Sequence, residues 1–184
     1  MRVIGGQYRG RRLRAPHGDQ VRPTSDRLRE TLFNIIAPRV EGCRFLDICA
    51  GSGAIGIEAL SRGAASATFI DKSRRASAII ESNLASLSIT SNATVINRDA
   101  LQALKRLSAD AAQFDIIFFD PPYASEIYSQ VMGELASGLL LDPEGVVITE
   151  HRAKRPPAAE YGELKMYREV KQGESALAFY ARAC

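Results

Sequence analysis

Four consecutive residues after a long apolar run carry groups that could do chemistry: Asp120, Pro121, Pro122 and Tyr123. The Asp120 carboxylate and the Pro121 carbonyl can each accept a hydrogen bond from an exocyclic amine. The Tyr123 ring can stack on the heterocycle that carries this amine. Two acceptors favour the pyramidal nitrogen that attacks an electrophile. The segment therefore predicts a site that holds a planar amine, although Asp-Pro pairs also occur in ordinary turns.

A buried strand must position this segment. Residues 114–119 lack the alternation of a half-exposed strand and so predict a strand that is buried on both faces. Neither proline can donate a hydrogen bond to a sheet, so we expect the strand to end there. Asp120 and Tyr123 would then lie at the carboxyl end of a central strand, where open α/β sheets bind ligands.

A glycine-rich turn forms the second candidate site. Gly51, Ser52 and Gly53 begin a G-x-G-x-x-G pattern between an expected strand and an expected helix, which is a fingerprint of nucleotide binding. Asp47 precedes the turn, in a position suited to a cationic group. Asp71 lies 24 positions after Asp47, at the end of the next strand, and is suited to ribose hydroxyls. S-adenosylmethionine carries both features, as an adenosine joined to a sulfonium and an ammonium group.

Three neighbouring positions complete the predicted cofactor site. Asp99 and Ala100 follow the third expected strand, where the adenine amine would be met. Asp99 could equally cap the following helix, and both roles can hold together. Lys72, directly after Asp71, is the remaining candidate cofactor-binding residue. NAD would share the glycine pattern, but no motif places either histidine for hydride transfer.

Alternating strands and helices must carry these segments. Strands are expected at 45–49, 67–71, 94–97, 114–119 and 145–150, with helices at 54–62, 73–87, 100–107 and 126–136. Such alternation predicts right-handed crossovers and a largely parallel sheet. The last residues differ, because 164–170 and 176–181 predict an antiparallel hairpin.

The amino-terminal residues predict a basic arm, 1–22, in front of a domain formed by 23–184. Residues 1–40 carry nine arginines and three acids, a balance of +6, and the rest of the chain carries −3. Apolar and basic residues alternate around glycines in the arm, as in a short β-hairpin. Such an arm favours a polyanionic partner, with a solvated charged tail as the alternative. The candidate substrate-binding residues are Tyr8, Arg9, Arg11, Arg12, Arg22 and Arg27.

A helix is expected after the arm. Thr24 or Ser25 can cap it, and Pro38 is expected to limit it. Its apolar residues recur at the spacing of one helix face. They are Leu28, Leu32, Ile35 and Ile36.

Composition indicates one soluble globular domain of 184 residues, with 46% apolar and 24% charged residues. No apolar stretch reaches the roughly 18–20 residues of a membrane span, and we expect no signal peptide. Cys43, Cys49 and Cys184 are widely spaced, which indicates a reducing cytoplasm and argues against zinc. Methylation at cytosine C5 would need a thiol nucleophile, and no cysteine is expected near Asp120.

Together these segments resemble the RsmD-type bacterial 16S rRNA guanine-N2 methyltransferases, from the first residues to the last strand. D-P-P-Y occurs broadly among amino-methyltransferases, whereas the amino-terminal block is far more specific. Cys49 departs from the family, which usually has a bulky apolar residue there. The matching blocks are 2–6 with the arginine-rich arm, 22–30 with Phe33-Asn34, 47–53, 58–64 and 120–123.

The resemblance implies a seven-stranded, Rossmann-like α/β fold of S-adenosylmethionine-dependent methyltransferases, with an N-terminal β-hairpin extension. It implies methylation of the N2 amine of one guanine in 16S rRNA, within an assembling or assembled small ribosomal subunit in the cytoplasm. Asp120, Pro121 and Tyr123 would be catalytic, and we expect a monomer without a metal. The alternatives are a DNA adenine-N6 or cytosine-N4 methyltransferase, an NAD-dependent oxidoreductase, and a catalytically silent RNA-binding module.

Overall fold

A computed structural model describes residues 1–15, 25–121 and 127–183 of the chain. The helices are α1 (Asp26–Val40), α2 (Ala54–Ser61), α3 (Arg74–Ser86), α4 (Ala100–Ala109) and α5 (Ile127–Ala136). The strands are β1 (Arg44–Ile48), β2 (Ser66–Asp71), β3 (Ala93–Asn97), β4 (Phe114–Phe119), β5 (Leu141–Arg152), β6 (Glu160–Tyr161), β7 (Leu164–Gln172) and β8 (Ser175–Arg182).

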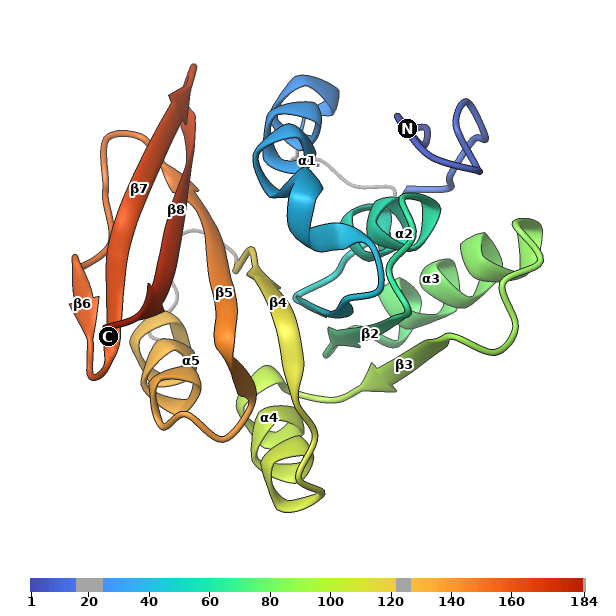
Figure 1. Cartoon of the computed structure of the whole chain (residues 1–184). Helices are drawn as coiled ribbons and strands as arrows, with labels where there is room; N and C mark the ends of the chain where they lie inside the picture. Colours follow the sequence, from blue (N-terminus) through green and yellow to red (C-terminus); the bar gives the residue numbers. More distant parts are fainter. Residues whose placement is uncertain (16–24, 122–126, 184) are drawn as a thin grey trace.

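The strands form one mixed sheet in the order β3-β2-β1-β4-β5-β8-β7-β6. The first five strands in this order, from β3 to β5, pair in parallel. The pairs β5-β8, β8-β7 and β7-β6 are antiparallel. Helices α1, α2 and α3 cover one face, and α4 and α5 cover the other (Figure 1). The predicted class, a mostly parallel α/β sheet with an antiparallel C-terminal hairpin, is confirmed.

Strand β4 lies between β1 and β5 and supplies both cores, as its apolar sequence predicts. Ile116 and Phe118 pack into the core under α1 to α3. Ile117 and Phe119 pack into the core under α4 and α5. This two-sided burial explains why the strand lacks alternation, and it fixes where residue 120 leaves the sheet.

Two details of the expected fold are wrong. The sheet has eight strands in the described residues rather than seven, because the two-residue β6 pairs with β7. The N-terminal β-hairpin is absent, since residues 1–15 form only an isolated antiparallel bridge between Arg2 and Arg12. Backbone hydrogen bonds still join the two halves of this segment, from the Val3 N–H to the Arg11 carbonyl and from the Leu13 N–H to the Met1 carbonyl. The segment also bonds to α2, where the N–H groups of Ile4 and Gly5 donate to the Glu58 carboxylate.

Helix α1 begins as predicted and ends later. Ser25 caps it by accepting a hydrogen bond from the Leu28 N–H at 3.2 Å. Pro38 lies inside the helix, which continues to Val40. Because Pro38 falls in the last turn, its missing N–H removes only one helical hydrogen bond. Among the described residues, no helix is both long and apolar enough to cross a membrane.

The packing of α2 on β2 gives a test of the fold. A Cβ atom at Gly56 would lie 2.3 Å from Cε1 of the buried Phe69 ring, whereas one at Gly133 of α5 would meet nothing within 4 Å. We expect Gly56→Ala to lower the free energy of unfolding by about 1–3 kcal/mol through overpacking. The control Gly133→Ala should raise it by about 0.5–1 kcal/mol. Urea denaturation measures both, and equal effects would contradict the packing described.

Candidate functional site

The acids predicted from the sequence gather at the carboxyl edge of the parallel strands. Ile48 of β1 pairs with Ile70 of β2 and with Phe119 of β4, and Phe119 pairs with Thr149 of β5. The residues that follow these strands therefore emerge side by side. Asp120 continues the ladder, since its N–H donates to the Ile48 carbonyl at 3.3 Å.

The glycine-rich turn between β1 and α2 is held to β2 by its own backbone. The Ala50 N–H donates to the Ile70 carbonyl at 3.0 Å, and the Gly51 N–H donates to Asp71 Oδ2 at 2.9 Å. Gly51 and Gly53 have φ angles of 57° and 75°, in the region that favours glycine. The predicted strand–turn–helix context is therefore confirmed.

Asp47 lies beneath this turn, with only 2% of its surface exposed. Its Oδ2 accepts a hydrogen bond from the Gly56 N–H at 2.9 Å. Burial raises the pKa of Asp47 to about 7, against the lowering effect of the Gly56 hydrogen bond and with a smaller raising effect of the Asp71 charge. A nearby cation would favour the ionised form of this carboxyl.

Asp71 ends β2, Asp99 follows β3 by two residues, and both carboxylates bind backbone N–H groups of the residues after them. Asp71 accepts hydrogen bonds from Gly51 and, through Oδ1 at 2.8 Å, from the Ser73 N–H. Lys72 beside it is exposed. Asp99 caps α4, because its Oδ1 accepts hydrogen bonds from the N–H groups of Leu101 and Gln102. The predicted cap is confirmed, and neither of these bonds uses Oδ2. Ala100 is buried at the start of α4.

Asp120 is partly exposed at the end of β4, followed by the buried Pro121. Desolvation, followed by the charges of Glu150 and Asp47, raises the pKa of Asp120 well above its ordinary range. Glu150 is only 5% exposed, and sequence reasoning missed it. Its place two residues after the apolar run 146–148, in the strand beside β4, was the signal. Tyr123 lies outside the described residues.

Cys49 corrects one expectation. Its pKa is raised to about 12 by burial, then by the charges of Asp71 and Asp120, so a cysteine does lie near Asp120. The parallel register brings it there, because residues 49 and 120 follow paired strands. The raised pKa keeps the group a thiol, which is a poor nucleophile. Within the described residues, no cluster of acids, cysteines and histidines could hold a metal ion.

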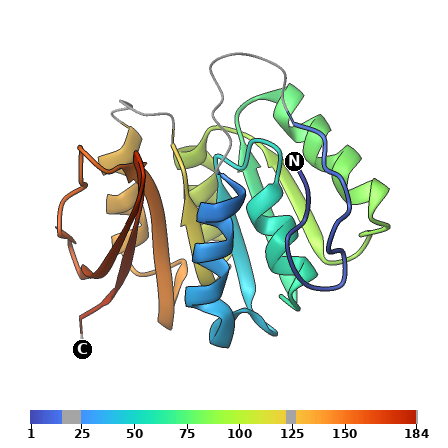
Figure 2. The same cartoon turned by 90° about the horizontal axis from the view of Figure 1, so that it is seen from above.

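The N-terminal arm, defined as the described residues 1–15, lies against α2 and α3 (Figure 2). Tyr8 is partly buried against the core, and its N–H donates to Ser61 Oγ at 2.9 Å. Arg11 Nη2 donates to the Ser86 carbonyl at 2.7 Å. Arg9, Arg12 and Arg27 are exposed, and Arg22 lies outside the described residues.

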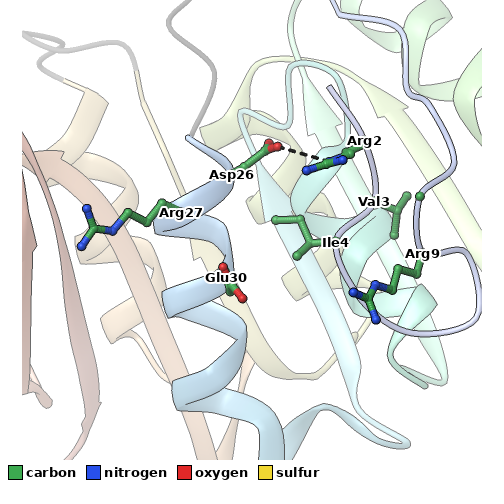
Figure 3. A pocket seen from close by; sticks show the side chains of 8 residues that line it. Arg2, Val3, Ile4, Arg9, Asp26, Arg27 and Glu30 are labelled. Atoms are coloured by element: carbon green, nitrogen blue, oxygen red, sulfur yellow. Dashed lines mark ion pairs between the residues drawn. The ribbon is translucent and has the colours of Figure 1, made fainter.

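A cleft of about 340 Å³ separates the arm from α1 (Figure 3). Arg2 points toward Asp26 across it, with 3.8 Å between Arg2 Nε and Asp26 Oδ2. The Arg27 side chain points away from the arm, so Arg9 and Arg27 do not converge. The lining residues are Arg2, Val3, Ile4, Arg9, Gly10, Asp26, Arg27 and Glu30.

Two fully buried charges fix the arm, and sequence reasoning predicted neither role. Arg29 Nη2 donates to the Arg2 carbonyl at 2.5 Å and to Asp26 Oδ1 at 3.0 Å. Glu58 accepts from two arm N–H groups and from Arg62 Nε at 2.8 Å. The signal for Arg29 was its spacing, since it shares a helix face with buried residues four, seven and eleven positions later.

Known proteins resemble the chain over nearly its whole length. The family described as "Conserved hypothetical protein 95" matches residues 1–181. "Putative rRNA methyltransferase YlbH" of Bacillus subtilis is 37% identical, over 99% of each chain. "Ribosomal RNA small subunit methyltransferase D" of Escherichia coli is 37% identical, over 99% of this chain and 90% of its own length.

Solved structures agree with this resemblance. "Putative methyltransferase yhhF from Escherichia coli" superposes with a TM-score of 0.87 and 35% identity, over 100% of this chain and 98% of the other. "SMU.776, a putative methyltransferase complexed with SAH" has a TM-score of 0.66 and 16% identity, over 84% of this chain and 48% of the other. The second likeness shows the fold alone. The resemblance drawn from the sequence motifs is confirmed.

The raised pKa of Asp47 predicts a pH dependence of stability. Between its ordinary value of 3.8 and about 7, the folded protein holds a proton that the unfolded chain has released. The free energy of unfolding should therefore fall as pH rises through this window, by at most about 1.4 kcal/mol per pH unit from this group. Asp47→Asn keeps an acceptor for Gly56 and should flatten the slope between pH 5 and pH 7 in urea denaturation. An unchanged slope would show that Asp47 is ionised throughout.

Proposed function

Because the chain belongs to the Conserved hypothetical protein 95 family, we propose that it is an S-adenosylmethionine-dependent rRNA methyltransferase that acts on the exocyclic N2 amine of one guanine in 16S rRNA. Relatives that are 37% identical carry the names of rRNA methyltransferases. The observation that carries the proposal is the place of Asp120. It lies beside β1 and its glycine-rich turn, among the acids of the same sheet edge.

The residues of this edge fit S-adenosylmethionine, which supplies a methyl group activated on a sulfonium. Asp71 would accept hydrogen bonds from the ribose hydroxyls, and Asp99 Oδ2 would accept one from the adenine amine. Gly51, Ser52 and Gly53 allow close approach of the ligand to the backbone, with Lys72 and Ala100 beside the nucleoside. The carboxylates, Asp47 among them, favour a ligand whose amino-acid end is cationic.

Asp120 would orient the target amine. Its carboxylate and the Pro121 carbonyl accept the two amine hydrogens, and Tyr123 stacks on the base. Cation binding lowers the pKa of Asp120 and supplies the ionised acceptor that this role requires. Asp120 and Pro121 would thus hold the nitrogen in line with the methyl group that the cofactor would supply, with the thioether as the leaving group and solvent as the acceptor of the proton that the nitrogen loses. Positioning supplies most of the acceleration, because the methyl group is already activated.

The basic N-terminal region would hold the RNA. Arg9, Arg12 and Arg27 are exposed, as phosphate contacts require. Tyr8 offers a partly exposed ring for stacking, and Arg22 extends the same basic stretch of sequence. The arm and the start of α1 face each other across the cleft of Figure 3. An unstacked guanine could then enter the site while the flanking phosphates stay on the arm.

A DNA adenine-N6 or cytosine-N4 methyltransferase is the second candidate, because the D-P-P-Y segment holds any planar amine. Two substrates offered side by side separate the candidates: small ribosomal subunits from a strain lacking the enzyme, and unmethylated plasmid DNA. Transfer of labelled methyl groups to the subunits alone is expected. Transfer to the plasmid alone would overturn the proposal.

Asp120→Ala tests the catalytic role directly. Loss of an acceptor that acts in the transition state should lower methyl transfer by at least about 100-fold, while affinity for S-adenosylmethionine stays nearly unchanged. Single-turnover assays and a cofactor titration measure the two quantities. Full activity in the variant would refute the assignment.

Asp71→Ala tests the ribose site. Removal of a charged acceptor should weaken S-adenosylmethionine binding by about 1–3 kcal/mol, roughly 5- to 150-fold in Kd. Asp110→Ala is the matched control, because this acid lies at the opposite end of α4 from Asp99 and pairs with Arg106 at the surface. Equal affinity in both variants would place the ribose elsewhere.

A further inference from the structure

Asn83 is a buried amide on the inner face of α3, with 1% of its surface exposed. Its Oδ1 accepts a hydrogen bond from the Arg14 N–H at 2.8 Å. Its Nδ2 donates to the Arg14 carbonyl at 3.0 Å and to the Ser52 carbonyl at 2.9 Å. One side chain therefore joins the N-terminal arm to the glycine-rich turn.

The chemistry of these three partners fixes the amide in one orientation. The two carbonyl oxygens require the NH2 group, and the Arg14 N–H requires the oxygen. In the reversed orientation, the Asn83 NH2 group would lie against the Arg14 N–H, and the Asn83 oxygen would lie against two carbonyl oxygens. Because every group of Asn83 is satisfied only when both segments are in place, the residue holds arm and turn in a defined relation.

The turn has a second contact with the arm. Ser52 Oγ donates to Met1 Sδ at 3.2 Å, and the Leu13 N–H donates to the Met1 carbonyl at 3.0 Å. Both ends of the described arm therefore converge on Ser52. Other hydrogen bonds of the turn lead to β2 and Asp71, so Asn83 and Met1 of the arm support the turn on the α3 side.

The arm is anchored along the same helix and the neighbouring one. Arg14 Nη1 and Arg11 Nη2 donate to Ser82 Oγ and to the Ser86 carbonyl, at 3.1 Å and 2.7 Å. Glu58 accepts from the other side of the arm. A ligand that binds the exposed arginines would therefore contact a segment that is hydrogen-bonded to the turn.

We propose that Asn83 is a positioning residue that couples RNA binding on the N-terminal arm to cofactor binding at the glycine-rich turn. The proposal rests on the proposed function, because it requires both ligands. RNA bound on the arm would stabilise the contacts of the arm with Asn83, and through Asn83 the turn, so the cofactor would then bind more tightly. Linkage requires the reverse effect to be equal in size.

Binding of labelled S-adenosylhomocysteine, which permits no turnover, tests the coupling. Its Kd is measured alone and with saturating small ribosomal subunits from a strain lacking the enzyme. The wild-type protein should bind about 5-fold or more tightly with subunits present. Asn83→Ala should reduce this ratio to about one and should also weaken binding alone. Glu81→Ala, an exposed position of the same helix, should behave as wild type.

Hydrogen exchange without any ligand gives a readout that is independent of RNA. The amides of Arg14 and of the turn should exchange faster in Asn83→Ala than in Glu81→Ala. Asn83→Asp keeps the side-chain volume and the Oδ1 acceptor but loses both donors, and it replaces the alanine variant if the cavity prevents folding.

The outcomes separate the two proposals. A wild-type protein that binds neither ligand refutes the proposed function. A wild-type protein that binds both ligands without a change in Kd, or an Asn83 variant that retains the full ratio, refutes the coupling alone.

Discussion

Carboxyl groups held close together at one sheet edge are the constraint on which the site depends. Asp47 lies in β1, Asp71 ends β2, Asp120 follows β4 and Glu150 lies in β5. Burial raises the pKa of Asp47 and of Asp120, with further raising from the charge of Asp71 on Asp47 and from the charges of Glu150 and Asp47 on Asp120. Such an arrangement costs folding free energy. A cationic ligand would relieve it, so the electrostatics of the fold and the chemistry of the proposed cofactor agree.

The fold places these acids through the register of β4. This strand is buried on both faces between β1 and β5, so it cannot slip without exposing apolar side chains. Its end is consequently fixed against the end of β1, and Asp120 is fixed beside the glycine-rich turn. The same register brings Cys49 close to Asp120, where its high pKa leaves it unreactive.

Local signals in the sequence were sufficient for most of the fold. The apolar run of β4, the glycines of the turn and the cap at Asp99 each express a preference of a few adjacent residues. The arm differs from the predicted hairpin because its two segments form only one isolated antiparallel bridge, between Arg2 and Arg12, and no paired strands. Here Glu58, more than fifty positions away, takes the N–H groups that a hairpin would have used. The contacts of Asn83 with Arg14 and of Arg29 with the Arg2 carbonyl could not be predicted for the same reason, since these partners are distant in the sequence.

The arm therefore joins the domain as part of its structure, and the basic region and the acidic edge meet at Ser52. A methyl donor and a polyanion have opposite charges, and a protein that binds both must keep their sites separate while linking their occupancy. The described arrangement meets both needs, with arginines exposed on the arm and buried amide and carboxylate contacts beneath it.

The most direct test of the central claim is mass spectrometry of 16S rRNA from a strain in which the gene for this protein is deleted. We predict that one guanine loses a single methyl group at N2, and that the wild-type protein restores this methyl group while Asp120→Ala does not. An unchanged set of methylated guanines in the deletion strain would contradict it.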